Sequence, residues 1–172
     1  MKSIVSRLFS ALVGSLLLAG CASYSGSSLP PGARQAEVKQ LMGEPAAIHP
    51  AGPGQQFTES WEYPRGPLGR HTYMARFDAS GKLVRLDQVL TQASVARIAL
   101  GSAKRDDVRA LLGRPGMILA DRKGGETWDY AAYAPDGMMR KIRIGVTFDS
   151  NGVATAAGES PDPEEWSPNG PE

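Results

Sequence analysis

The sequence predicts an α+β fold built from two tandem repeats, each with helices packed on a three-stranded antiparallel meander. Three blocks of residues predict this duplication, because each block occurs twice and in the same order. They are Val-x-x-Leu-x-Gly-x-Pro at residues 38–45 and 108–115, Trp-x-Tyr at 61–63 and 128–130, and Phe-Asp-x-x-Gly at 77–81 and 148–152. The intervals between blocks differ by a few residues, which loops absorb at small cost in free energy. We therefore predict a first repeat at residues 32–90 and a second repeat at residues 91–157.

The first block has the features of a helix end. Its apolar residues are spaced i, i+3 and i+4, so they share one helical face. Its glycine supplies the left-handed conformation in which helices commonly end, and its proline prevents the helix from continuing. This pattern predicts a helix over residues 33–42 and a matching helix that ends near Leu112.

At the start of the second repeat, a further helix is predicted over residues 91–99, with Thr91 as its N-cap. Ser102 is expected to cap the helix of the second repeat. Asp106 and Asp107 then lie in the first turn of that helix, where the helix dipole favours negative charge.

The strands are predicted from alternating apolar and polar residues. A polar, Pro- and Gly-rich loop at residues 46–56 precedes the first sheet. The predicted strands cover residues 57–63, 73–77 and 83–90 in the first repeat, and residues 126–133, 141–148 and 153–157 in the second.

Residues 1–20 have the features of a signal peptide. Lys2 and Arg7 precede an apolar run at residues 8–19, shorter than the stretch of about 20 residues that a membrane-spanning helix needs. The run ends in Leu-Ala-Gly-Cys, which resembles the bacterial lipoprotein signal. That resemblance implies cleavage before Cys21 and a covalent diacylglycerol and acyl chain, such as palmitate, on Cys21. Ala22 resembles the second residue of lipoproteins sorted to the outer membrane. An ordinary secretion signal is the alternative, but Cys21 is the only cysteine of the chain.

Two further segments are predicted to lie outside the repeats. Residues 21–31 read as the lipidated cysteine followed by a flexible tether rich in Ser, Gly and Pro. Residues 158–172 are acidic and Pro-rich, which is typical of a disordered tail. A short partner-binding motif around Trp166 is the alternative interpretation of this tail.

The charge balance does not indicate nucleic acid as a partner. Without Lys2 and Arg7, the 19 basic residues of the chain fall to 17, against 18 acidic residues. Such a nearly neutral chain lacks the basic surplus of a nucleic-acid-binding domain.

Catalysis is not predicted, and neither is a cofactor or a metal site. The sequence has no Gly-x-Ser-x-Gly elbow, no His-Glu-x-x-His pair and no Walker phosphate loop. Its two histidines, His49 and His71, have no metal-ligand or triad partner at an informative spacing. We expect a protein that is not an enzyme.

Two sets of residues are candidates for binding a partner. The first set is aromatic and lies on one face of one predicted strand in each repeat. These side chains either fill the core beneath the helices or form a concave aromatic sheet face. The second is a basic set at the two hairpin turns; these are either solvated charges or contacts for a partner or for anionic phospholipid headgroups. The aromatic set is Trp61, Tyr63, Trp128 and Tyr130, and the basic set is Arg65, Arg70, His71, Arg140, Lys141 and Arg143.

Together, the lipoprotein signal and the three repeated blocks resemble the SmpA/OmlA family of BamE-like outer-membrane lipoproteins, small subunits of the β-barrel assembly machinery. The resemblance covers residues 32–90 and 92–157. It implies two helices on a three-stranded antiparallel sheet for a single-copy member. This chain departs from that pattern because it is doubled and because its first repeat lacks the leading helix. The doubled layout is also similar to β-lactamase inhibitory protein, which binds an enzyme through a concave sheet.

The resemblance implies an outer-membrane lipoprotein that faces the periplasm and acts as a non-enzymatic accessory or scaffold in β-barrel protein assembly and envelope integrity. The implied partners are subunits of the assembly machinery or another envelope protein. The alternative is an enzyme-inhibitor-like binding protein of the periplasm. That alternative predicts exposed aromatic side chains on a concave sheet, whereas the accessory role predicts that Trp61 and Trp128 are buried.

Overall fold

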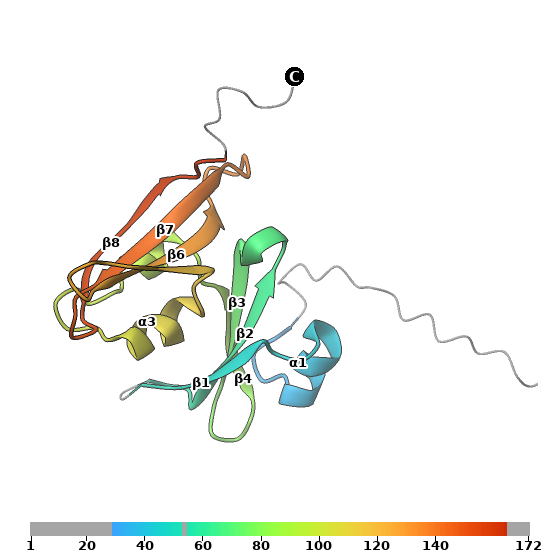
Figure 1. Ribbon diagram of the computed structural model, residues 1–172. Coiled ribbons are helices and arrows are strands. Elements are labelled where there is room, and N and C mark those ends of the chain that lie inside the picture. The colour runs from blue at the N-terminus through green and yellow to red at the C-terminus, as the bar shows by residue number, and fades with distance from the viewer. Residues whose placement is uncertain (1–28, 53–54, 165–172) are drawn as a thin grey trace, which may run out of the picture.

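The computed structural model describes residues 29–52 and 55–164. The predicted signal peptide, Cys21, most of the tether and the tail from residue 165 lie outside the described residues. The described chain forms two four-stranded antiparallel sheets, one in each repeat, with strand orders β1-β2-β3-β4 and β5-β6-β7-β8 (Figure 1). The predicted α+β class with two tandem units is confirmed.

The elements follow the same order in the two repeats, except that the second begins with an additional short helix and has no counterpart of the 3-10 helix of the first. The first repeat contains α1 (Gln35–Met42), β1 (Ala47–Pro50), β2 (Glu59–Arg65), the 3-10 helix η1 (Pro67–Gly69), β3 (His71–Phe77) and β4 (Leu83–Gln88). The second repeat contains α2 (Gln92–Val95), α3 (Arg105–Leu112), β5 (Met117–Ala120), β6 (Glu126–Tyr133), β7 (Lys141–Phe148) and β8 (Ala154–Pro161).

The prediction of three strands in each repeat is wrong, because a short edge strand adds a fourth to each sheet. β1 lies within residues 46–56, which were predicted as a loop, and pairs with β2; β5 pairs with β6 in the same way. Each has only four residues, too few for an alternating pattern to stand out. Pro50 ends β1, and proline is tolerated there because it lies on an edge strand.

The two main helices begin with the same contact, which differs from the predicted cap. The Lys104 amide donates to the Asp107 carboxylate at 2.8 Å, and the Arg34 amide donates to Glu37 at 2.7 Å. Ser102, predicted as the cap of α3, instead donates its hydroxyl to the Ala99 carbonyl. An acidic residue three positions into the helix therefore takes over the capping role. Thr91 is confirmed as the N-cap of α2, because its hydroxyl accepts a hydrogen bond from the Ser94 amide, but α2 ends at Val95 and not at residue 99 as predicted.

Each repeat has its own aromatic core with matching contacts. Trp61 lies 4.6 Å from Phe77 between ring centres, and Trp128 lies 4.8 Å from Phe148. α1 covers this face of the first sheet through Val38 and Met42, and α3 covers the equivalent face of the second sheet. The repeated sequence blocks thus supply the same packing in both halves.

The Phe-Asp-x-x-Gly block forms the same tight turn in both repeats. Asp78 accepts the amides of Ser80 and Lys82 at 2.8 and 3.0 Å, and Asp149 accepts two amides of its own turn at 2.9 Å. Hydrogen bonds, foremost from the Ser80 hydroxyl and the Val153 amide, lower the pKa of the Asp78 and Asp149 carboxyls. The local sequence therefore encodes these hairpins without help from the rest of the fold.

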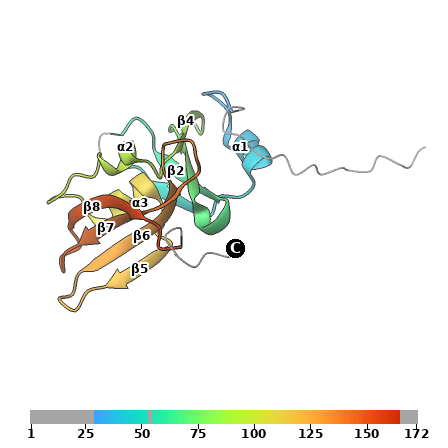
Figure 2. The same cartoon turned by 90° about the horizontal axis from the view of Figure 1, so that it is seen from above.

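The predicted start of the tail at residue 158 is wrong, because β8 continues to Pro161. Gly158 pairs with Gly145, and Pro161 pairs with Ile142, along the edge of β7. Figure 2 shows β8 beside β7 along this length. The strand is held by backbone pairing and by the buried Asp162 that follows it, rather than by β-forming side chains, so its composition did not predict it.

α3 lies between the two sheets in both views (Figures 1 and 2). It covers the second sheet and also contacts β1 of the first repeat. The first sheet is therefore covered on both faces, by α1 on one side and by the second repeat on the other. This arrangement places the contact between the repeats at the centre of the molecule.

Candidate binding site between the two repeats

The face of the first sheet that is turned away from α1 is polar and buried. Side chains from β1, β2 and β3 alternate onto this face and have at most 7% of their surface exposed. They are His49, Ser60, Glu62, Thr72, Met74 and Arg76. Buried polar groups are costly unless they are hydrogen-bonded, so the partners of these side chains define what this face does.

Glu62 links the two repeats from the centre of this face. Its side chain, about 2% exposed, lies 2.7 Å from His49 Nε2 through one oxygen. Its other oxygen accepts the Arg114 backbone amide at 3.2 Å. Gly113 allows this approach, because a Cβ at that position would lie 3.0 Å from the Glu62 carboxyl carbon. The glycine of the second helix end therefore serves both the helix end and the contact between repeats.

The His49–Glu62 pair does not form a catalytic triad. Ser60 is the cross-strand neighbour of His49, but its buried hydroxyl has no hydrogen-bond partner among the described residues. A nucleophilic serine must be bonded to its base. Sequence reasoning missed the pair, because His49 and Glu62 meet only through the unpredicted strand β1.

Replacing Glu62 by alanine is expected to lower the free energy of unfolding by about 2 kcal/mol, because the Arg114 amide and His49 would lose a buried acceptor. Urea unfolding followed by circular dichroism measures this loss. Glu44, which pairs with Lys39 on the surface, is the matched control, and Glu44→Ala should cost less than about 0.5 kcal/mol. Equal costs for the two variants would contradict a buried bridging role for Glu62.

The structure brings Arg70 and Arg143 of the predicted basic set together around one carboxylate. Arg70 is buried and donates to Asp162 at 2.7 Å and to the Ala132 carbonyl at 3.2 Å. Arg143 Nε lies 3.3 Å from Asp162, and Arg143 also bonds Asp129. Burial raises the pKa of the Asp162 carboxyl, but hydrogen bonds from Arg70 and the Glu164 amide outweigh it, and the pKa lies below its usual range. Arg70 therefore joins the two repeats, Arg143 bonds within the second repeat, and neither arginine is free for headgroups.

The remaining basic candidates do not form a common surface. Arg65 donates to the Met42 carbonyl at the end of α1, and the His71 ring lies 5.0 Å from the Tyr133 ring. Lys141 is half-buried on β7. Arg140 is exposed but pairs with Asp136 in its own turn. Most of the side chains in the basic set therefore have partners within the protein, and binding of a partner or of headgroups by this set stays a prediction.

The four aromatic side chains of the first candidate set do not form an exposed sheet face. Trp61, Tyr63, Trp128 and Tyr130 are all buried beneath the helices. The indole nitrogens of Trp61 and Trp128 donate to Glu59 and Glu126, the first residues of their own strands. These residues belong to the two cores, which is the first of the two interpretations that the sequence allowed for the aromatic set.

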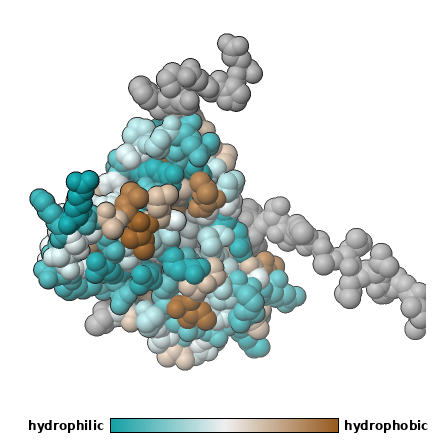
Figure 3. All heavy atoms as spheres, in the orientation of Figure 1, coloured by the Kyte–Doolittle hydropathy of each residue, from teal (hydrophilic) through white to brown (hydrophobic). Residues whose placement is uncertain are grey.

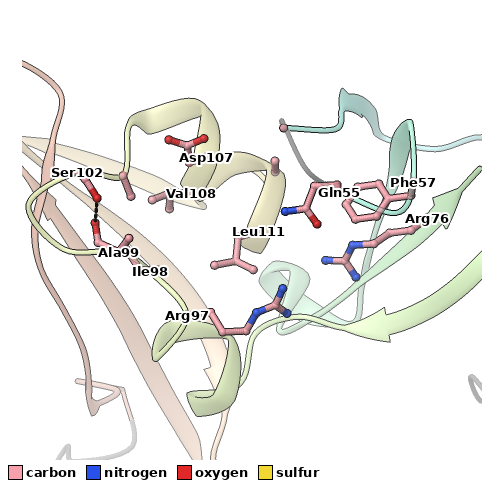
Figure 4. A pocket seen from close by; sticks show the side chains of 13 residues that line it. Gln55, Phe57, Arg76, Arg97, Ile98, Ala99, Ser102, Asp107, Val108 and Leu111 are labelled. Atoms are coloured by element: carbon pink, nitrogen blue, oxygen red, sulfur yellow. Dashed lines mark hydrogen bonds between the residues drawn. The ribbon is translucent and has the colours of Figure 1, made fainter.

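A pocket of about 290 Å³ opens between the repeats beside the polar face. Gln55, Phe57 and Arg76 of the first repeat and Arg97 and Leu111 of the second contribute to its walls (Figure 4). Sequence analysis did not propose any of these residues for binding, and it placed Leu111 on the apolar face of the repeated helix-end block. Their spacing carries no motif, because the pocket exists only where the two repeats meet.

The outer surface is mainly hydrophilic on the face seen in Figure 3, with separate hydrophobic patches. Met117, Ile118 and Leu119 of the edge strand β5 are each about half exposed. Within residues 29–52 and 55–164, no three metal-ligating side chains gather at one point. No helix in the same part of the chain is both long and apolar enough to cross a membrane.

Residues 88–158 match the family model described as the outer membrane protein assembly factor BamE domain. No curated protein and no solved structure matches the chain, so the predicted likeness to β-lactamase inhibitory protein is not confirmed. The matched segment begins at the end of the first repeat and covers α2, α3 and the second sheet as far as the middle of β8. Residues 88–158 are therefore similar to the BamE domain, the family that the repeated blocks and the lipoprotein signal resemble.

Proposed function

We propose that this protein is an outer-membrane lipoprotein and a non-enzymatic accessory of β-barrel outer-membrane protein assembly. The match of residues 88–158 to the BamE domain carries the proposal. A lipid anchor on Cys21 would hold the folded repeats on the periplasmic side of the membrane. The tether that follows would leave them free to contact subunits of the assembly machinery.

The enzyme-inhibitor alternative loses its main support. It requires aromatic side chains exposed on a concave sheet, and Trp61 and Trp128 are core residues. The second face of the first sheet, which could have served as such a surface, is covered by the second repeat. Contacts with an assembly partner would then use the outer edges, including the exposed apolar side chains of β5.

Chemical cross-linking in the native outer membrane, followed by affinity capture of the full chain, tests this function. We expect the subunits of the β-barrel assembly machinery to be captured in stoichiometric amounts. Cys21→Ala is the control, because without the anchor the chain should leave the membrane fraction and capture less of the machinery. Capture of a soluble periplasmic enzyme in place of the machinery, or of no envelope protein at all, would overturn the proposal.

A further inference from the structure

The pocket between the repeats contains two guanidinium groups that point toward one another. Figure 4 shows Arg76 from β3 and Arg97 from the turn after α2 directed into the same space, with Gln55 and Leu111 beside them. Phe57 lies against Arg76, whose guanidinium carbon is 5.3 Å from the ring centre. The opposite wall is apolar and includes Ile98 and Val108. The pocket therefore joins positive charge to a hydrophobic surface.

The positive charge of this pocket is only partly balanced. Asp87 is shared between Arg76 and Arg85, and the Arg97 side chain has no ion pair among the described residues. Asp107 also lines the pocket, but its carboxylate accepts the Lys104 amide at the start of α3. The lining of the pocket thus holds two guanidinium groups and one carboxylate, and that carboxylate is already engaged in capping a helix.

Arg76 has donor capacity that the protein does not use. Its side chain is about 2% exposed, and its Nε has no hydrogen-bond partner among the described residues. Burial, helped by Arg85 and Arg97 and opposed by Asp87, lowers the pKa of Arg76 to about 10. A buried arginine with an unused donor is costly, and an anionic group in the pocket would offset that cost.

We propose that this pocket binds a carboxylate of a partner peptide, either an acidic side chain or a chain end, next to an apolar residue. Paired guanidinium groups match the planar carboxylate through parallel hydrogen bonds. The apolar wall would take the neighbouring side chain. At about 290 Å³, the pocket lies at the small end of ligand sites, which suits one or two side chains better than the two acyl chains of a phospholipid.

The test uses the full chain in zwitterionic detergent micelles and a small probe, acetyl-Ala-Leu with a free carboxylate. Nuclear magnetic resonance should show saturable shifts of the Arg76 and Arg97 Nε–H signals and of the Leu111 amide. The C-terminal amide of the same probe should bind at least about tenfold more weakly, because a charge-assisted pair is lost.

Arg97→Gln should weaken binding of the carboxylate probe about tenfold, and because Arg97 is exposed, the fold should be unaffected. Arg122→Gln removes the same charge from the exposed loop between β5 and β6 and should leave probe binding unchanged. The absence of saturable shifts, or equal binding of the acid and the amide, would overturn the proposal.

Inorganic phosphate and phosphatidylglycerol vesicles serve as further probes, because they show whether the pocket prefers a phosphate group or a lipid to a peptide carboxylate. Tighter binding of either one than of the peptide probe would also overturn the proposal. The carboxylate site depends on the pocket alone and goes beyond the proposed role in assembly. Capture of the assembly machinery and binding of the probe are therefore separate readouts, and either can fail without the other.

Discussion

Replacement of Trp128 by alanine is expected to lower the free energy of unfolding by about 4 kcal/mol. The indole is about 1% exposed and packs against Phe148 in the core of the second repeat. Its nitrogen donates to Glu126 at 2.8 Å, and the Arg109 guanidinium lies 4.8 Å from its ring centre. Truncation would leave a cavity and remove both polar contacts, so the loss should approach the upper range for aromatic core residues.

Urea unfolding of the full chain, followed by far-ultraviolet circular dichroism, measures this loss. Met138 is about 83% exposed, so Met138→Ala should change the free energy of unfolding by less than about 0.5 kcal/mol. Trp61→Ala should cost about as much as Trp128→Ala, because Trp61 makes the equivalent contacts with Phe77 and Glu59. A Trp128→Ala variant as stable as Met138→Ala would contradict the core assignment.

The elements that sequence reasoning located well are those whose signals are local. β6 and β7 were predicted with the observed bounds, because residues 142–148 alternate cleanly between core and surface. The helix ends were predicted because glycine and proline act on the backbone within two residues. The Phe-Asp-x-x-Gly turns were predicted for the same reason, since Asp78 and Asp149 accept amides of their own turns.

The features that sequence reasoning missed depend on contacts between distant segments. Ser60 and Glu62 alternate with Trp61 and Tyr63, which is the usual pattern of a strand with one solvated face. They are buried because α3 and the loop after it cover that face. β1 was missed because a strand of four residues is stabilised by the edge it pairs with, not by its own side chains.

The residues of the candidate site show the same contrast between local sequence signals and contacts between distant segments. Arg65, Arg70 and His71 are close in sequence and were predicted to share a surface. Arg65 instead bonds the Met42 carbonyl of its own repeat, whereas Arg70 and His71 contact the second repeat. Arg76 and Arg97 lie in different repeats, and nothing in their spacing indicates that they meet. A pocket formed between two repeats can be recognised only after the repeats have been placed against each other.

Replacement of Asp162 by asparagine is expected to lower the free energy of unfolding by about 3 kcal/mol at neutral pH. Asp162 is fully buried and is the carboxylate partner of Arg70, which is buried as well. The two residues are 92 positions apart, so this pair ties the end of β8 to the start of β3. Removing one partner leaves a buried charge uncompensated, which is the costly way to break such a pair.

The pH dependence of this loss distinguishes the ion pair from simple packing. The pKa of Asp162 is depressed in the folded state, so its contribution is fully present above the ordinary aspartate pKa of about 3.9 and is lost as pH falls through the lower folded pKa. The difference between the original chain and Asp162→Asn should therefore be constant near pH 7 and shrink in acid. Glu164→Gln, an exposed change two residues away, should show neither effect. A difference that persists unchanged in acid would mean that Asp162 acts through its shape, and that the arginines around it do not depend on its charge.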